Sequence, residues 1–231
     1  MNTLLLRLAG PLQAWGDESK FEYRKTESFP TKSGIIGLLS AALGRRRDEV
    51  LDDLNVLNFG IRIDQPGELL HDFHTARTAD NKNTYVTHRY YLSDAIFLVG
   101  LESDDKEKLK NLEEALKQPV YSLFLGRRSC PPTLPIILGI RELPLLEALQ
   151  KEPWLVTDWR QKKDKFQLNN KLPVITDAEA GLAGSFLKKD LPKSFSPFKR
   201  EYGYRALVHQ GYVEFNNDTL ETEHDPLEEL R

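Results

Sequence analysis

The sequence contains a single cysteine, Cys130, among 231 residues. One thiol excludes an internal disulfide and a zinc site built from the cysteines of one chain. No stretch approaches the roughly 20 apolar residues that cross a bilayer, and the N-terminal segment lacks the pattern of a secretory signal with its small-residue cleavage site. We therefore expect a protein of the reducing cytoplasm that has no membrane partner.

The sequence also lacks the positive net charge that is typical of nucleic-acid-binding proteins, since its formal charge is −3 and its pI is about 6.0. The acidity is concentrated in residues 214–231, which hold seven acidic residues and one basic residue. The rest of the chain is net positive. We expect residues 214–231 to form a solvated acidic tail, and docking on a basic partner surface is the alternative.

Signatures of common catalytic and metal sites are absent. No Gly-x-x-x-x-Gly-Lys-Ser/Thr motif occurs, so nucleotide hydrolysis has no support. His71, His74 and His88 lie in one segment, but strand residues three apart point to opposite faces, so His71 and His74 are not expected to share an ion. No cofactor and no metal are predicted. The aromatic motif of ordinary RNA-recognition domains is missing too, so loops and the projecting arm described below would have to carry any RNA contact.

The order of the predicted elements indicates an α+β fold. Strands are predicted at 3–9, 59–64, 92–101 and 134–140, and helices at 31–44, 48–57 and 104–117. This β-α-β-β-α-β order is that of a ferredoxin-like, RRM-like main domain over residues 1–141. Residues 142–213 predict a small β-rich C-terminal lobe, with a short helix at 145–150 and strands at 154–159, 205–209 and 212–215.

Residues 68–91 predict a projecting β-hairpin arm. Two strand-like runs flank a polar, asparagine-rich centre at 77–83, and long projecting segments of this kind are more often functional than structural. The arm combines rings with cations, a mixture suited to splayed single-stranded bases. Its members are Arg77, Lys82, Tyr85, His88, Arg89, Tyr90 and Tyr91. For Tyr91 we expect a packing role.

Other segments outside the arm have the chemistry of contacts with anions or bases. Thr31–Gly34 stands at a predicted helix start, where free N–H groups, hydroxyls and one ammonium favour an anion, and an ordinary helix cap is the alternative. Gly126–Ser129 carries two arginines whose planar guanidinium groups suit phosphates and base edges. The alternative is a solvated loop with no ligand. Arg45–Arg47 follows a helix end, where a structural role is expected. Gln13 and Trp15 either contact a base or plug the core.

Four segments, in this order, resemble the CasD family of type I-E CRISPR Cascade complexes, which belongs to the RAMP superfamily. They are Leu6–Gly16, Phe29–Leu39, Asp72–Thr75 and Tyr121–Pro131, the last with the core Leu-Gly-Arg-Arg-Ser-Cys-Pro. Their combination is specific, whereas each motif alone is weak, and they span landmarks from residue 6 to about 135. The resemblance ends near residue 142.

The resemblance implies a non-catalytic subunit that holds the 5′ handle of the CRISPR RNA and caps the backbone filament. The implied partners are the backbone subunit CasC and the large subunit CasA, and no cofactor is needed. The arm would act as a thumb that packs against a neighbouring backbone subunit and kinks the guide RNA, with residues 74–89 in that role. The predicted RNA-binding residues are Gln13, Trp15, Arg24, Thr31, Lys32, Ser33, Gly34, His74, Arg77, His88, Arg89, Arg127, Arg128 and Ser129.

Two other functions stay open. The first is a metal-independent endoribonuclease that processes precursor CRISPR RNA, with Tyr23, Lys32, His74 and His88 as acid–base candidates. The resemblance opposes it, because in type I-E complexes a separate subunit does the cutting. The second is a protein-only scaffold, which would scatter its basic residues over the surface.

Overall fold

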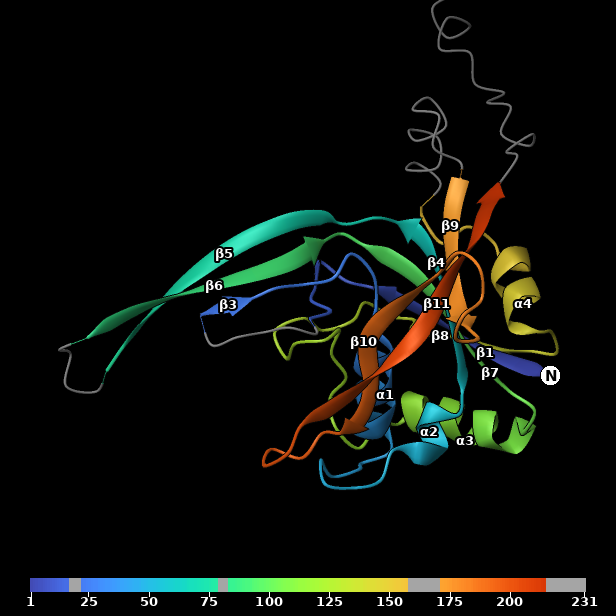
Figure 1. The fold of residues 1–231 in the computed structure, drawn as a ribbon, viewed down its shortest axis with the longest axis horizontal. Coiled ribbons are helices and arrows are strands. Elements are labelled where there is room, and N and C mark those ends of the chain that lie inside the picture. Colours follow the sequence, from blue (N-terminus) through green and yellow to red (C-terminus); the bar gives the residue numbers. More distant parts are fainter. Residues whose placement is uncertain (17–21, 79–82, 158–170, 215–231) are drawn as a thin grey trace, which may run out of the picture.

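The computed structural model describes residues 1–16, 22–78, 83–157 and 171–214. Within these residues an antiparallel seven-stranded sheet has the order β10-β11-β9-β4-β7-β1-β8. Its strands are β1 (Asn2–Ala9), β4 (Asn58–Gln65), β7 (Ile96–Ser103), β8 (Ile137–Arg141), β9 (Lys171–Ala178), β10 (Ser185–Ser194) and β11 (Glu201–Glu214). The fold is mostly sheet with a few helices, which is an α+β fold (Figure 1).

The apolar run near the N-terminus forms β1, which lies between β7 and β8. Leu4, Leu6 and Leu8 belong to one buried cluster and Leu5 to another. Successive side chains of a strand point to opposite faces, so a run without polar alternation requires cover on both faces of the sheet. Helices and loops provide that cover.

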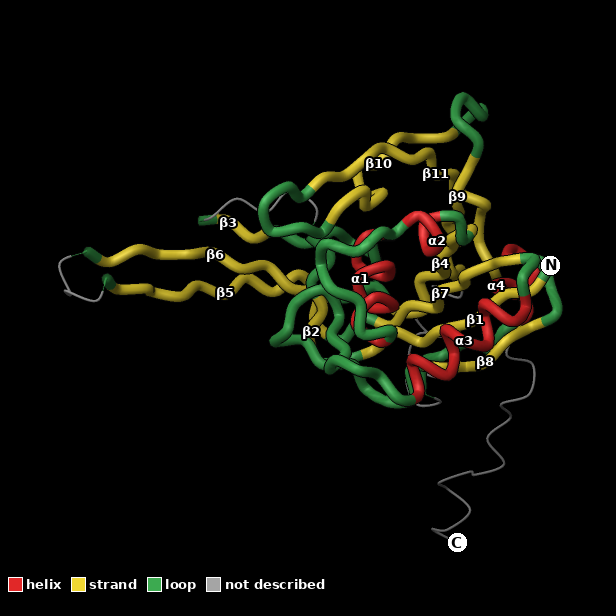
Figure 2. The backbone as a smooth tube through the Cα atoms, turned by 90° about the horizontal axis from the view of Figure 1, so that it is seen from below, coloured by secondary structure: helices red, strands yellow, loops and turns green. Residues whose placement is uncertain are grey.

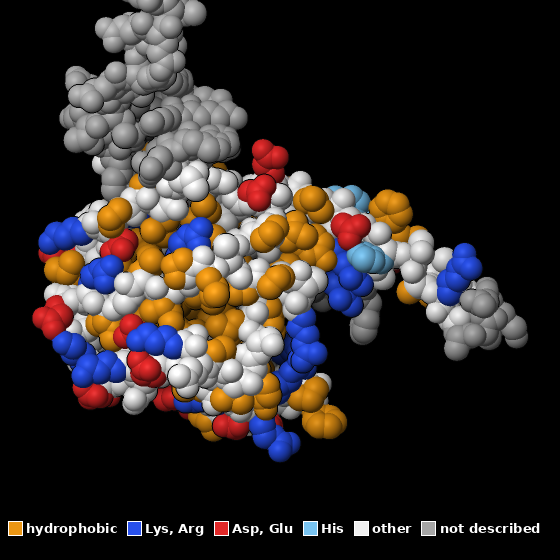
Figure 3. Space-filling model, turned by 180° about the vertical axis from the view of Figure 1, so that it is seen from behind, with side chains coloured by type: hydrophobic (Ala, Val, Ile, Leu, Met, Phe, Trp, Pro, Cys, Tyr) orange, Lys and Arg blue, Asp and Glu red, His pale blue; other side chains and the backbone are white. Residues whose placement is uncertain are grey.

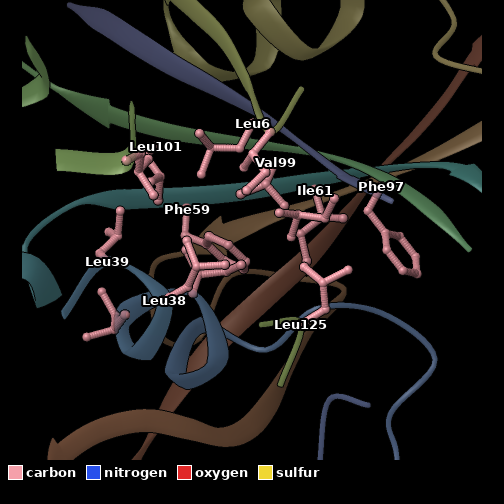
Figure 4. Close-up of a cluster of buried hydrophobic side chains, with 14 of the residues drawn as sticks. Leu6, Leu38, Leu39, Phe59, Ile61, Phe97, Val99, Leu101 and Leu125 are labelled. Carbon is pink, nitrogen blue, oxygen red and sulfur yellow. The ribbon is translucent and has the colours of Figure 1, made fainter. Parts of the chain in front are cut away.

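Helices pack on both faces of the sheet. On one face, α1 (Lys32–Ala42) and α3 (Lys106–Lys117) enclose the larger core, to which Leu39 contributes, together with residues of β1, β4 and β7 (Figure 4). On the other face, α4 (Leu145–Lys151) packs Leu149 against β1 and β7. The larger core therefore lies directly beneath α1, the helix that borders the candidate site described below.

The helix starts follow from side-chain caps. Thr31 Oγ1 accepts a hydrogen bond from the Gly34 N–H at 3.2 Å, and Asp105 Oδ1 accepts one from the Lys108 N–H at 3.0 Å. The helix predicted over 48–57 is shorter: α2 covers only Asp52–Asn55.

The hairpin consists of β5 (Glu68–Arg77) and β6 (Thr84–Ser93), which pair in register from Glu68↔Ser93 to Arg77↔Thr84. In Figure 1 it extends well beyond the sheet. Two short strands complete a second sheet on β6: β2 (Leu12–Gln13) is antiparallel to it and β3 (Tyr23–Arg24) is parallel. Figure 2 shows β3 running beside β6, about midway along that strand.

The chain beyond β8 differs from the expected strands. Residues 154–157 form no strand, and the rest of the strand predicted to 159 lies outside the described residues, as does most of the acidic tail. One long strand, β11, takes the place of the two predicted at 205–209 and 212–215. Its pairing with β9 shifts register between His209 and Tyr212, near Gly211, and the strand continues on both sides of the shift. Neither β9 nor β10 was expected, since β10 carries a proline and several charges.

The boundary predicted at residue 142 lies between β8 and α4. The strands after it extend the same sheet, since β9 pairs with β4 from Gly60↔Thr176 to Arg62↔Val174. Among the helices of the described residues, none has the length and apolar content to cross a membrane.

Candidate nucleic-acid interface

A cavity of about 770 Å³ opens beside α1. Its walls come from one side of α1 along its length, from residues 14–16, from the loop after that helix, from the loop at 121–128 and from residues near the start of β11. Six arginines contribute to these walls: Arg45, Arg46, Arg47, Arg127, Arg128 and Arg200. Such a concentration of guanidinium groups favours a polyanion. Lysine and arginine side chains also gather below the base of the hairpin and along the adjoining edge of the body (Figure 3).

The arginine loop depends on a glycine. Gly126 has a φ of +81°, and a Cβ at this position would lie 1.7 Å from the Ala14 carbonyl oxygen. The turn is closed by backbone hydrogen bonds from Leu125 N–H to the Cys130 carbonyl at 2.7 Å and from Cys130 N–H to the Arg127 carbonyl at 2.9 Å. The neighbouring arginines are therefore held on a tight turn that packs against the end of β2.

The two arginines of this turn differ in their surroundings. Arg127 Nη2 donates to the carbonyls of Arg24 at 2.6 Å and Lys25 at 3.1 Å, and its guanidinium lies 4.8 Å above the Tyr91 ring. Its Nη1 is buried and has no hydrogen-bond partner among the described residues. Arg128 and Ser129 are exposed. Arg127 thus ties the loop to β3, while Arg128 is accessible to a ligand.

At the start of α1, the chain supplies its own anion. Lys32 N–H donates to Asp190 Oδ2 at 2.9 Å, and Lys32 Nζ donates to Asp177 Oδ2 at 2.9 Å and to the Leu57 carbonyl at 2.9 Å. These carboxylates of β9 and β10 take the place expected for a ligand anion. Although burial opposes its charge, Arg205 has a raised pKa because it pairs with both Asp190 and Asp177.

The other residues predicted near this helix are also mostly enclosed. Thr31 caps the helix, and Ser33 is buried, although both border the cavity together with Gly34. Gln13 is fully buried: its Nε2 donates to the Ala95 carbonyl at 2.7 Å, and its Oε1 accepts from Trp15 Nε1 at 3.0 Å. Trp15 lies in the core, as in the second of the two roles considered for it, since its side chain is 1% exposed.

The hairpin has two chemically different faces, because residues paired directly across an antiparallel ladder share a face. His71, Phe73, His88 and Tyr90 belong to one face by their pairings. On this face Phe73 is 65% exposed.

The opposite face of the hairpin is more polar. Asp72 pairs across the ladder with Arg89, and His74 Nε2 lies 2.6 Å from Asp72 Oδ2. Arg24 joins this face through its parallel pairing with Arg89, whose Nε is buried without a hydrogen-bond partner among the described residues. Arg77 is exposed and lies toward the tip on the ring-bearing face.

The structure thus brings some of the predicted residues together and separates others. Arg127 and Arg128 share the cavity with Thr31, Ser33 and Gly34. His74, Arg77, His88 and Arg89 lie on the hairpin, away from these cavity walls. Lys82 falls outside the described residues.

Sequence reasoning missed Arg45–Arg47 and Arg200 as parts of the same wall. Arg45–Arg47 was assigned a structural role, which holds for Arg45, since its guanidinium makes paired contacts with Asp53, one at 2.6 Å. Arg46 is 79% exposed. A run of three arginines after the same helix as the predicted anion site was the available signal, whereas nothing near Arg200 pointed to this cavity.

The acid–base candidates do not converge. Lys32 is paired inside the body, while His74 and His88 lie on opposite faces of the hairpin. Tyr23 stacks on His88 with ring centroids 4.7 Å apart. Among the described residues, no three histidine, cysteine, aspartate or glutamate side chains form a group that would hold a metal ion.

Comparisons with known proteins agree on one family. The model of the CRISPR-associated protein family Cas5 matches residues 3–208. The CRISPR system Cascade subunit CasD of Escherichia coli (strain K12) is 40% identical over 157 residues, which cover 59% of this chain and 70% of that protein.

Two solved structures share the fold over nearly the whole chain. A Cas protein crystal structure has a TM-score of 0.72 at 39% identity, covering 92% of this chain and 95% of the other. A chain of a CRISPR RNA-guided surveillance complex has a TM-score of 0.73 at 31% identity, covering 92% and 91%. By these matches, the chain belongs to the CRISPR-associated Cas5 family.

Proposed function

We propose that this protein is the CasD-type subunit of a type I-E Cascade complex, which holds the 5′ handle of the guide RNA without cutting it. The observation that carries the proposal is the arginine-lined cavity beside α1. Six arginines line it although the chain as a whole has an acidic net charge, so positive charge is concentrated at a hollow that could take an RNA strand. Family membership and the similarity to a surveillance-complex chain support the same function.

The strand order supports a ferredoxin-like, RAMP-type main domain. The strands β4, β7, β1 and β8 lie in this order, with α1 joining β1 to β4 and α3 joining β7 to β8 along the chain. A β-α-β-β-α-β unit with its first and third strands in the centre has this arrangement. We propose that the hairpin between the second and third strands is the thumb of that domain.

The accessible RNA contacts in this proposal are Arg46, Arg128 and Arg200 in the cavity, with Ser129, Arg24, Arg89 and His74 toward the hairpin. The buried members of the predicted set, among them Gln13, Trp15 and Lys32, would act by holding the walls in place. Proposed partners are the backbone subunit CasC on the hairpin and the large subunit CasA.

The test measures RNA binding as a function of salt. The full chain, alone and assembled with its partner subunits, is titrated with labelled repeat RNA at several salt concentrations. Because phosphate contacts release counterions, replacing Arg46, Arg128 or Arg200 by Gln is expected to flatten the plot of log K against log salt by about 0.7 per contact. Lys151→Gln, at an exposed ion pair on α4, is the matched control. Unchanged slopes in all three cavity variants would contradict the assignment.

The ribonuclease alternative is favoured by one contact, the exposed Asp72–His74 pair, since a carboxylate can orient an imidazole as an acid–base group. Incubating the chain with labelled repeat RNA without metal distinguishes the two functions. We expect bound, intact RNA. A site-specific product that disappears in His74→Ala or His88→Ala would replace the proposed function by RNA processing.

A further inference from the structure

Tyr23 is a large aromatic side chain that the fold keeps at the surface. It is 47% exposed and begins β3, a strand of only two residues. Its ring stacks on His88 of β6 with centroids 4.7 Å apart and an angle of 9° between the planes. One side of the ring is thus supported by the hairpin.

Behind Tyr23 the stacking continues across the hairpin. His88 stacks on His71 at 5.1 Å and 21°, and His71 stacks on Tyr90 at 4.6 Å and 12°. His71 Nε2 and His88 Nδ1 also lie 2.9 Å apart, within hydrogen-bond distance. The four rings form a row of successive contacts that runs from β3 to β6, across to β5 and back to β6, and Tyr23 is one end of that row.

The segment that carries Tyr23 is fixed on both sides. His88 N–H donates to the Glu22 carbonyl at 2.7 Å, and Trp15 N–H donates to Thr26 Oγ1 at 2.9 Å. Holding an exposed ring by backbone contacts lowers the entropy that a ligand must overcome to bind it. A ring fixed in this way suits recognition better than mobile surface packing.

The Tyr23 segment is connected to a wall of the arginine-lined cavity through Arg127. Arg127, which lines that cavity, donates to the carbonyl of Arg24, the residue after Tyr23. A strand that leaves the cavity past Arg127 toward the hairpin would pass this ring. Tyr23 lies between an exposed acidic residue, Glu22, and an exposed basic residue, Arg24, and its own uncharged ring offers a surface for a neutral base.

We propose that Tyr23 stacks on one unpaired nucleobase of the bound RNA, as the terminal ring of the Tyr23–His88–His71–Tyr90 row. This rests on the proposed function of the cavity. The row supplies a flat, supported aromatic surface, and base stacking on such a surface tolerates any base identity, because every base has a π-face. Tyr23 therefore positions the strand and reads no sequence.

The experiment uses repeat RNAs that carry 2-aminopurine at one 5′-handle position each, bound to the full chain in its assembled complex. We expect one position to be strongly quenched by stacking in the wild type. Tyr23→Ala should abolish that quenching and weaken RNA binding about tenfold, as is typical of a lost base–aromatic stack. Tyr23→Phe and Tyr23→Trp should keep both.

Tyr212→Ala is the matched control, since this tyrosine of β11 is 64% exposed. Equal quenching and affinity in Tyr23→Ala and Tyr212→Ala would overturn the stacking inference while leaving salt-sensitive binding, and thus the proposed function, intact. Failure of the wild type to bind RNA would overturn both. Weakened assembly of Tyr23→Ala with partner subunits in the absence of RNA would assign the ring to a protein contact and also overturn the inference.

Discussion

At the scale of single residues, the arginine turn depends on one backbone conformation more than on any side chain. Gly126 combines a positive φ with an approach to the Ala14 carbonyl that leaves no room for a Cβ. The motif around it predicts a loop that presents two arginines, but no local pattern indicates that the guanidinium of Arg127 holds β3. The same loop sequence is compatible with two accessible arginines. Whether Arg127 is accessible depends on the Arg24 and Lys25 carbonyls that the fold brings next to it.

Gly126→Ala is therefore expected to lower both the stability of the protein and its affinity for RNA, because the turn must move away from Ala14. Gly181→Ala is the matched control: its φ is +90°, but nothing lies within 4 Å of an added Cβ. Thermal unfolding and RNA titration of both variants separate the loss due to the clash from the strain of positive φ alone. Equal losses in the two variants would contradict this explanation.

At the scale of elements, local signals identified β1, β4, α1 and α3, because each has a buried stripe or a cap that the sequence shows directly. The anion expected at the start of α1 is an instructive case. A ligand anion is predicted there, whereas the structure places a carboxylate of the chain itself at this position, that of Asp190, more than 150 residues away along the chain. A contact between residues so far apart leaves no local pattern in the sequence. Asp190 reaches the helix because it lies on β10, a strand that the sequence did not predict.

The loop between α1 and α2 gives a pH-dependent prediction. The hydrogen bond from Arg45 lowers the pKa of Asp53 below its usual 3.8. A lowered pKa in the folded state means that the contribution to stability is present above that usual value and is lost as the pH falls through the folded pKa. The stability difference between the wild type and Asp53→Asn should thus shrink toward about pH 2. A difference that is constant from pH 2 to 6 in chemical unfolding would contradict the role of this pair.

At the scale of the whole molecule, a buried ion pair joins the layers on the α4 side. Arg62 of β4 and Asp64 are fully buried and paired at 2.8 Å, and Arg62 also donates to the carbonyls of Leu149 at 2.7 Å and Pro153 at 2.7 Å. The sheet is thereby fastened to the end of α4. The strand pattern predicted β4, but it gave no reason to expect an arginine in the interior.

Arg62→Met is expected to destabilise the protein by about 3–5 kcal/mol, because it leaves a buried carboxylate without its partner. Burial already raises the pKa of Asp64, so the variant should recover stability as the pH falls and this group binds a proton. The double variant Arg62→Met/Asp64→Leu should be more stable than the single one. Chemical unfolding at two pH values measures both effects, and a single variant with wild-type stability would refute this account.

The continuity of the sheet has a mechanical consequence. β9 is hydrogen-bonded to β4, and Arg205 of β11 pairs with Asp177 of β9 and Asp190 of β10. Lys32 of α1 donates to the same two carboxylates, so these three strands are fastened both to the sheet and to α1. Bending is then expected where β4 passes into β5 at Pro66–Gly67 and where β6 returns through Asp94. The hairpin is therefore a lever arm on a stiff body, and a force on its tip is expected to act at these two connections rather than within the sheet.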